Sequence, residues 1–453
     1  MKKFLSSYWI RSAFFTFLQR FSLTLFGLVN FMILIRVLSK EQMGVWALFL
    51  IITTIFETTK TSLLKNAHIK FVSSDVDNFN KTHIASSSLA MNISISLLFI
   101  IFLYFFHKPF SDFFNSGKEL SDMLLWFIPG LIFMVFFSHL EAIQQSHFDF
   151  KGIFAGHLTR QVIFFILICV EYFNNSAFTM KSLAIFQSVS VLGGAIVLYM
   201  YSKKYLHHIF NPTKIWIKKL SNYGGYIFGT GLITNLSVNT DQMLMGIFMN
   251  PGAVALYNAS SRISGFVDIP SFAASEILFP KLVKANDVEG ETKVQYFLER
   301  MTSVLLCIVV PAALFIIIFP KFVVGIIAGK EYLNAALILQ LYMITSIIGV
   351  FQNQAANTLN SIGKPGLCFR LNLVSFVIKV ALTYSCLVAF DFYGAAIGTV
   401  LTFFLSFFVW YYFLRKIVKV SFSRILGMVI NNYNLIFVRA KELVKKRAIK
   451  SPG

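Results

Sequence analysis

Long apolar runs recur along the whole chain and constrain its fold more than any other feature. The backbone of a segment inside a bilayer must satisfy its own hydrogen bonds, which leaves helices or closed barrels, and about 20 apolar residues suffice for one helix. With 57% hydrophobic residues and a mean hydropathy of +0.70, the composition excludes a soluble globular protein. We therefore expect an all-α polytopic membrane protein of about twelve transmembrane helices. The expected spans are 12–35, 44–64, 84–106, 121–141, 158–173, 181–202, 222–248, 253–279, 301–328, 334–360, 367–390 and 393–414.

Basic residues between these runs set the expected orientation. The formal net charge of +20 invites comparison with nucleic-acid-binding proteins, but the Lys and Arg residues lie mostly in short loops and in the tail. With the N-terminus in the cytoplasm, 27 of the 40 fall on the inner side, 7 on the outer side and 6 inside spans. This bias predicts an even number of spans and cytoplasmic N- and C-termini, and no nucleic-acid partner.

The last segment, 416–453, is too polar to span. Phe422, Ile425, Val429 and Tyr433 follow a helical spacing, and a basic stretch comes after them. We expect a basic amphipathic tail that lies on the anionic inner surface of the membrane. A tail that binds a protein partner is the other interpretation.

Six cationic side chains interrupt the apolar runs. Each would cost roughly 2.5–3.5 kcal/mol at the centre of a bilayer, so six facing lipid would cost about 15–20 kcal/mol. We expect them to face one another, a water-filled cavity or an anion, which suits a protein that carries negative charge. The six are Arg11, Arg20, Lys60, Arg160, Arg262 and Lys379.

An internal repeat relates the two halves of the chain. The segment 36–46, which ends one run and enters the next through Trp46, resembles 247–257, which ends at Tyr257. The same offset of about 211 residues pairs Glu57 with Asp268. Copies in the same direction predict two six-helix bundles, 1–210 and 211–415, related by an axis along the membrane normal, with substrate bound between them.

Several of these segments resemble one known family. Asn239-Thr-Asp-Gln-Met-Leu-Met-Gly246, Pro251-Gly-Ala-Val-Ala-Leu-Tyr-Asn-Ala259, Ile277-Leu-Phe-Pro-Lys281 and Leu38-Ser-Lys-Glu-Gln-Met-Gly44 are similar to segments of the lipid-linked oligosaccharide flippases. These O-antigen and capsule type exporters belong to the multidrug/oligosaccharidyl-lipid/polysaccharide superfamily. The resemblance covers about residues 8 to 415.

The resemblance implies a flippase of the bacterial inner membrane that serves surface polysaccharide biosynthesis. Its substrate would be a polyprenyl-pyrophosphate-linked oligosaccharide, moved by alternating access through a cationic central cavity. Membrane lipids and other polysaccharide assembly proteins would be its partners, with no cofactor, no metal and no enzymatic activity.

Candidate contacts for the pyrophosphate are Arg20, Lys60 and Arg262, because a cation about 4 Å from a phosphate gains roughly 4 kcal/mol at an effective dielectric constant near 20. The competing interpretation is pairing with acids. Lys60 stands one turn from Glu57, and Arg262 shares its span with Asp268 and Glu276. Arg160 is expected near an inner membrane surface.

Amide side chains on two spans are candidates for binding sugar hydroxyls, because amides both donate and accept hydrogen bonds. Hydrogen bonding between helices is the alternative for each of them. The candidates are Asn235, Asn239 and Gln242 on one span, and Asn353, Asn357 and Asn360 on another.

Asp241 matches the acid that in some relatives of this family helps to bind sodium. Lys379 is a fixed cation that would occupy the place of such an ion, so we expect an Asp241–Lys379 pair and no sodium coupling. A proton or the membrane potential stays open as the driving force, and we expect Asp241, Lys379, Glu57 and Asp268 to act in coupling or gating.

Three alternatives remain at this stage. A multidrug antiporter of the same superfamily would favour an acidic cavity for its cationic substrates. The peptidoglycan precursor flippase carries two further spans. A membrane glycosyltransferase or polysaccharide polymerase is the enzyme alternative, carried only by Asp75-Val-Asp77, a pair of acids in a short loop. The four cysteines lie apart in apolar runs without metal-ligand spacing.

Overall fold

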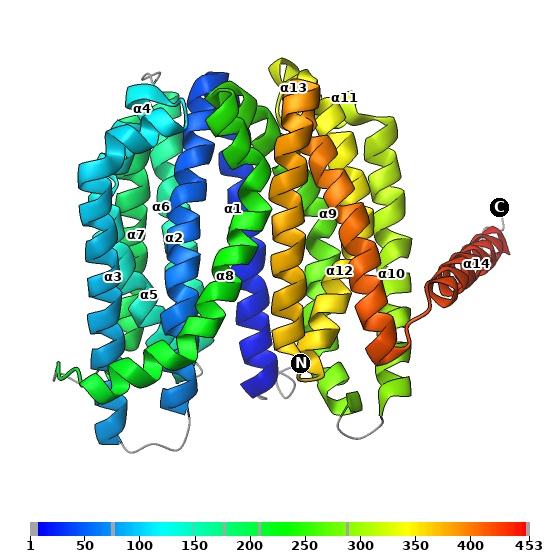
Figure 1. The fold of residues 1–453 in the computed structure, drawn as a ribbon, viewed down its shortest axis with the longest axis horizontal. Helices are drawn as coiled ribbons and strands as arrows, with labels where there is room; N and C mark the ends of the chain where they lie inside the picture. Colours follow the sequence, from blue (N-terminus) through cyan, green and yellow to red (C-terminus); the bar gives the residue numbers. More distant parts are fainter. Residues whose placement is uncertain are drawn as a thin grey trace. The chain divides into compact units, whose positions relative to one another are not determined.

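The computed structural model describes residues 8–73, 78–147, 149–174, 178–206, 210–286 and 290–449. Within these ranges every regular element is a helix (Figure 1), as the apolar runs predict. Asp75 and Asp77, which carried the enzyme alternative, lie outside the described residues, as does the side chain of Arg11.

By packing, the chain divides into unit 1, residues 1–255, and unit 2, residues 256–453. In unit 1, α2 packs on α3, α5 and α8, and α7 packs on α4, α5 and α6. Division at residue 210 follows the sequence repeat and stays a prediction, whereas packing joins α8 to unit 1. The helices of unit 1 are α1 (Tyr8–Val37), α2 (Lys40–Ser73), α3 (Asn78–Phe113), α4 (Gly117–Trp126), α5 (Ile128–Ser146), α6 (Phe150–Phe173), α7 (Met180–Ser202), η1 (Lys203–Tyr205) and α8 (Lys214–Phe248).

Unit 2 is built around α12, which packs on both α10 and α13. The first residues of α9, Pro251 to Ala255, belong to unit 1 and the rest of that helix to unit 2. The helices are α9 (Pro251–Lys284), α10 (Glu291–Ile318), α11 (Pro320–Ile327), η3 (Lys330–Ala335), α12 (Ala336–Ser361), α13 (Pro365–Val418) and α14 (Phe422–Ile449).

Eight of the described helices are long and apolar enough to cross a membrane, and α4 with α5 forms a ninth candidate bent by 46°. Pro129 is the second residue of α5, next to this bend. α8 and α9, with 35 and 34 residues, are long enough to span but are not among these nine candidates. α13 is counted once, although it contains two of the expected spans. The described helices therefore agree with the multi-pass architecture, although hydropathy alone does not count twelve.

Helix boundaries repeat along the chain. α2 runs from 40 to 73 and α9 from 251 to 284, so both have 34 residues and the offset is 211 at each end. α1 and α8 end at Val37 and Phe248, again 211 residues apart. The helix boundaries therefore repeat at the offset read from the sequence, and the parallel relation of the two copies stays a prediction.

α13 is two antiparallel helices joined by a tight bend (Figure 1, orange). The backbone leaves helical geometry at Phe390 and at Asp391, where φ is 46°. Trp410 Nε1 donates to Ser375 Oγ at 3.2 Å, and a Cβ on Gly394 would lie 2.0 Å from the Cys386 carbonyl oxygen. The expected break between spans 367–390 and 393–414 is therefore present.

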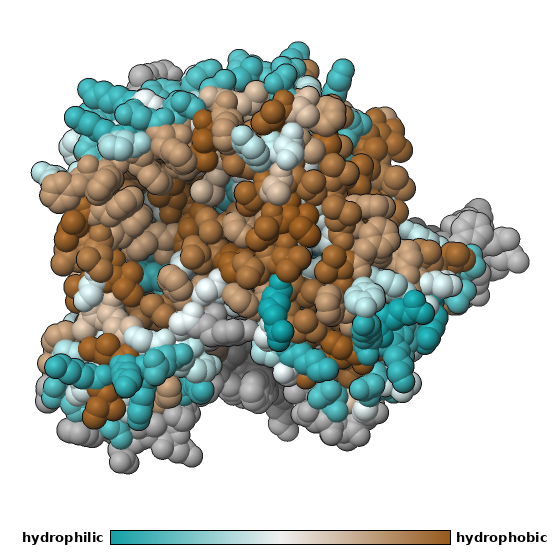
Figure 2. Space-filling model, viewed as in Figure 1, coloured by the Kyte–Doolittle hydropathy of each residue, from teal (hydrophilic) through white to brown (hydrophobic). Residues whose placement is uncertain are grey.

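On the face shown in Figure 2, apolar side chains cover the middle height of each unit and hydrophilic side chains gather at the ends. Half-exposed side chains such as Phe105 on α3 and Phe404 on α13 belong to these surfaces. A soluble protein would not expose so many aromatic rings, whereas acyl chains cover them without penalty. α14 forms the predicted tail helix, and it packs on α10.

Candidate functional site

A line of polar side chains follows the buried face of α2. Thr53, Glu57, Lys60 and His68 recur at intervals of three, four or eight residues and are at most 8% exposed. This spacing keeps them on one side of the helix, against α3 and α5. The helix thus carries this line of polar and charged side chains, which we call the seam, through the interior of unit 1.

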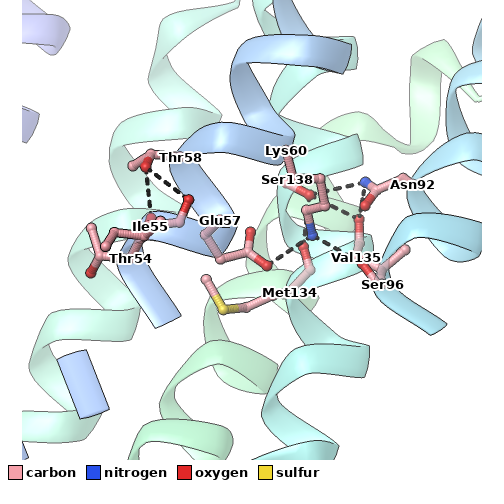
Figure 3. Close-up of polar contacts among 10 residues, drawn as sticks. All are labelled: Thr54, Ile55, Glu57, Thr58, Lys60, Asn92, Ser96, Met134, Val135 and Ser138. Carbon is pink, nitrogen blue, oxygen red and sulfur yellow. Dashed lines mark hydrogen bonds and ion pairs between the residues drawn. The ribbon is translucent and has the colours of Figure 1, made fainter. Parts of the chain in front are cut away.

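Lys60 lies at the centre of this seam (Figure 3). Its Nζ is 2.8 Å from Glu57 Oε1 and donates to Ser96 Oγ on α3 at 3.2 Å. The Lys60 side chain is 1% exposed, and its ammonium also lies 5.3 Å from the centre of the Phe56 ring. In this structure the pairing that the sequence offered as the alternative is the one observed, and anion binding by Lys60 stays a prediction.

A second cluster lies farther along α2. Lys65 Nζ is 2.9 Å and His157 Nε2 is 3.2 Å from the same Glu141 oxygen, so one carboxylate of α5 joins α2 to α6. Arg160, the eleventh of 24 residues in α6, lies over the Phe137 ring at 5.7 Å and interacts electrostatically with Glu57 and Glu141. Arg160 therefore lies close to the seam, and its expected position near a membrane surface stays a prediction.

A cavity of about 10 Å³ separates the two clusters, which is room for about one water molecule. Lys60, Lys65, Asn92, Ser138 and His139 line it. Asn92 Nδ2 donates to Ser138 Oγ at 3.0 Å and to the Val135 carbonyl at 3.2 Å (Figure 3). The seam is thus a connected polar network, which we name the α2 network: Glu57, Lys60, Lys65, Asn92, Ser96, Ser138, His139, Glu141, His157 and Arg160.

The α2 network carries an excess of positive charge. Its fixed cations are Lys60, Lys65 and Arg160, against the two carboxylates of Glu57 and Glu141. A buried charge is tolerated only with a partner, because its desolvation costs several kcal/mol. Each carboxylate here holds at least one cation, and the arrangement leaves one positive charge in excess that an anionic ligand would balance.

Arg20 lies on α1 and is exposed, as is Thr24, whose hydroxyl donates to the Arg20 carbonyl. Asn30, on the same helix, is buried at 5% exposure. Among the three predicted pyrophosphate contacts, Arg20 is thus the one that lies open on the surface of its unit.

Arg262 belongs to unit 2, where its Nε donates to Asn258 Oδ1 one turn earlier on α9, at 3.0 Å. Asp268, on the same helix, hydrogen-bonds to Ser346 of α12, and Ser346 also lies 3.0 Å from Ser264. A polar seam between α9 and α12 therefore holds Asp268, and the expected role of either residue in transport stays a prediction.

The predicted sugar-binding amides differ in their exposure and in the backbone carbonyls to which they donate hydrogen bonds. Asn357 Nδ2 donates to the Ser275 carbonyl across the α9–α12 seam at 3.0 Å. Asn235 and Asn239 on α8 each donate to the carbonyl four residues earlier, at 2.7 and 2.9 Å. Of the rest, Gln242 is buried, Asn353 is half-buried and Asn360 is exposed.

Asp241 and Lys379 are both buried, at 3% and 5% exposure, in units 1 and 2 respectively. Their pairing would join the two units and stays a prediction. Among the described residues, no group of three His, Cys, Asp or Glu side chains is placed to hold a metal ion.

Sequence reasoning missed the residues that other helices bring to α2. Glu141 was available as an acid at the end of an expected span, and such an acid is by default a functional candidate. His139 and His157 gave no comparable signal, because single histidines at these spacings are common in packed helices. Their role follows from helix packing alone.

Solved structures share this fold. Lipid II flippase MurJ, in an inward closed conformation, aligns with a TM-score of 0.77 at 14% identity, over 94% of this chain and 92% of that one. An inward-facing multidrug resistance MATE family transporter of the MOP superfamily aligns with a TM-score of 0.76 at 13% identity, over 89% and 95%. The chain therefore shares its fold with a flippase and with a multidrug transporter.

Sequence relatives give a second line of comparison. The probable low-salt glycan biosynthesis flippase Agl15 of Haloferax volcanii is 23% identical over 222 residues, which cover 49% of this chain and 45% of that protein. The chain spans about half the length of the first curated relatives it matches. The model of the polysaccharide biosynthesis protein family matches residues 33–337, about two thirds of the chain. This protein belongs to the polysaccharide biosynthesis protein family.

Proposed function

We propose that the protein is a flippase that moves a polyprenyl-pyrophosphate-linked oligosaccharide across the bacterial inner membrane for surface polysaccharide biosynthesis. Transport would proceed by alternating access through a cationic cavity. The observation that carries this proposal is the positive excess of the α2 network, buried within helices that match membrane spans. Family membership and the flippase fold support the same function.

The Lys60–Glu57 pair would stabilise such an anion site when no substrate is bound. An anion site inside a membrane protein needs a counter-charge when it is empty, because an unpaired buried ammonium is costly. Glu57 supplies that charge at 2.8 Å from the same helix. We propose that the pyrophosphate replaces Glu57 as the partner of Lys60 during transport. The Lys60–Glu57 ion pair would form again when the substrate leaves.

Arg20 and Arg262 would complete the anion site. Arg20 is exposed on unit 1, so its guanidinium is accessible to a phosphate. A guanidinium also matches two phosphate oxygens at once. The sugar would bind to neutral amides, with half-buried Asn353 and exposed Asn360 the most accessible of the six predicted residues.

The test is transport of a labelled lipid-linked oligosaccharide in proteoliposomes by Lys60→Met, Glu57→Gln and the double variant. Lys60→Met alone leaves Glu57 uncompensated and should lower both stability and transport. The double variant removes both charges and should fold nearly as well as the native protein. We expect its transport to stay at least tenfold reduced, since the phosphate has lost about 2 kcal/mol or more of attraction.

Lys118→Gln, which removes an exposed cation at the start of α4, is the matched control and should leave transport unchanged. If the double variant folds and transports at the native rate, Lys60 serves packing alone and the proposed anion exchange is wrong.

A multidrug antiporter is the second candidate, favoured by the fold shared with a MATE family transporter. The positive excess of the α2 network opposes it, because cationic drugs would be repelled. Efflux of a cationic dye from the same proteoliposomes, in the absence of any oligosaccharide transport, would establish this candidate in place of the flippase.

A further inference from the structure

A second, larger cavity lies in unit 1 and is not part of the α2 network proper. Its volume is about 290 Å³, and α2, α3, α5, α7 and the segment after α7 form its walls. We name it the histidine pocket after His68, His139 and His147, which line it together with Lys81, Phe136 and Tyr199. All of these residues lie in one packing unit, so the pocket is a property of unit 1 alone.

The histidine pocket extends from one end of the unit 1 helices towards their apolar outer surface. Lys81 is in the first turn of α3, and His147 directly follows α5. Phe136 lies eleven residues before His147, which corresponds to about 16 Å along α5. Phe136 and Tyr199 are 48% and 50% exposed on the surface that acyl chains would cover. The pocket therefore has a polar mouth and an apolar wall, the two environments that an amphiphile needs.

Its polar groups are cationic or neutral. Lys81, three imidazoles and the hydroxyls of Thr82 and Ser86 line the pocket, and among the residues that the structure describes no carboxylate lines it. The ring of His147 stacks on Tyr205 at 4.3 Å, and His147 Nδ1 bonds to the Ile143 carbonyl at 2.9 Å. This contact fixes the proton on Nδ1, so Nε2 is the atom left to meet a ligand.

Two further imidazoles carry unsatisfied polar atoms. His68 and His139 are 1% and 7% exposed, and their rings meet edge to face at 5.8 Å. The Nδ1 atom of each is buried without a hydrogen-bond partner. Buried polar atoms are normally satisfied, and such an exception beside a cavity indicates a ligand or water that supplies the missing bond.

We propose that the histidine pocket binds an anionic glycerophospholipid of the membrane leaflet at this end of unit 1. The phosphate would lie against Lys81 and His147, the glycerol ester oxygens near the buried imidazoles, and one acyl chain along Phe136 and Tyr199. His139 lines both this pocket and the water-sized cavity beside Lys60 and Lys65, so the lipid would contact the α2 network through a single side chain.

A lipid explains the pocket better than a soluble anion does. Free phosphate would gain from Lys81 but would leave the apolar wall unfilled, whereas a phospholipid satisfies both ends of the pocket. The proposal concerns binding and does not depend on what the protein transports.

The test measures binding of phosphatidylglycerol to the purified full chain in detergent, by native mass spectrometry and by the shift in thermal unfolding, with phosphatidylcholine as the neutral comparison. We expect one phosphatidylglycerol per chain at this site. Lys81→Gln should weaken binding about tenfold, and Ala85→Phe, which fills the pocket from α3, should abolish it.

Two matched controls accompany these variants. Lys203→Gln removes a nearby lysine that does not line the pocket, and Ala90→Phe adds the same ring farther along α3; both should bind phosphatidylglycerol as the native protein does. Equal binding by all four variants would overturn the proposal. Full competition by inorganic phosphate would also overturn it, as would displacement by polyprenyl phosphate at lower concentration, which would assign the pocket to the carrier lipid. Because no transport is measured, failure here leaves the proposed flippase function intact.

Discussion

Gly44 and Pro251 are in direct backbone contact: a Cβ on Gly44 would lie 1.7 Å from the Pro251 carbonyl oxygen. Gly44 is in the second turn of α2, and Pro251 begins α9, the copy of α2 in the internal repeat. Both residues belong to unit 1. The two repeated turns therefore meet, and the close approach requires that one residue lack a side chain.

Gly44→Ala should consequently destabilise the protein. The obstructing atoms are backbone and cannot rotate away, so we expect a loss of about 1–3 kcal/mol, the usual range for overpacking. Thermal unfolding in detergent would measure it. Gly27→Ala on α1 is the control, because its added Cβ meets nothing within 4 Å. Equal unfolding temperatures for the two variants would contradict the observed contact.

Tyr257 joins α9 to the bend of α13. Its hydroxyl donates to the Phe392 carbonyl at 2.6 Å and accepts from the Ala396 N–H at 3.1 Å, two groups four residues apart in the first turn after the break. Tyr257 is fully buried. The side chain thus satisfies a carbonyl and an N–H at the place where α13 changes direction.

Tyr257→Phe removes this bridge and keeps the ring. We expect a loss of about 1–3 kcal/mol in the free energy of unfolding, because buried backbone groups lose their partner. Urea unfolding followed by tryptophan fluorescence would measure it. Tyr393→Phe is the control, because Tyr393 is only partly buried. It should change the free energy of unfolding by less than about 0.5 kcal/mol. A Tyr257→Phe protein as stable as the native one would show that the hydroxyl is dispensable.

Glu299 anchors the tail helix. This α10 side chain is 2% exposed, and its Oε1 accepts the Ser421 N–H at 2.8 Å and Gln295 Nε2 at 2.9 Å. Ser421 directly precedes α14, so the carboxylate lies at the positive end of that helix. Tyr433, the twelfth residue of α14, adds a contact by donating to the Cys307 carbonyl at 3.2 Å.

Glu299→Ala should release the start of α14. We expect a local loss of about 2–3 kcal/mol, equivalent to roughly thirty- to hundredfold faster amide hydrogen exchange over residues 421–433. Glu291→Ala, at the exposed start of α10, is the control and should leave exchange in the tail unchanged. Unaltered protection of the tail in Glu299→Ala would mean that apolar packing alone holds α14.

Much of the fold could be predicted, because apolar runs and the lipid environment leave few alternatives to helices. The runs mark only the apolar part of a helix, however. The span expected at 44–64 is the middle of α2, which continues from Lys40 to Ser73 among polar residues. Similarly, the expected span 121–141 is two helices, because Pro129 sits where α4 and α5 meet.

The candidate site was less predictable, because periodicity places residues on one helix but does not say which helices meet. The Glu57–Lys60 pair could be anticipated, since three residues separate the two side chains. The Lys65–Glu141–His157 cluster could not, because its members come from α2, α5 and α6. Asn357, a predicted sugar contact, bonds to α9 in this structure, and it is the packing of the two helices that decides this bond.

The equal lengths and spacing of α2 and α9 bear on how such a chain arises. When a gene encoding an even number of spans is duplicated in tandem, the second copy enters the bilayer in the same direction as the first without any added segment. An ancestral half of six spans would meet that condition. Residues such as Gly44 and Pro251, where the copies meet, are then the first positions at which the two halves were free to diverge.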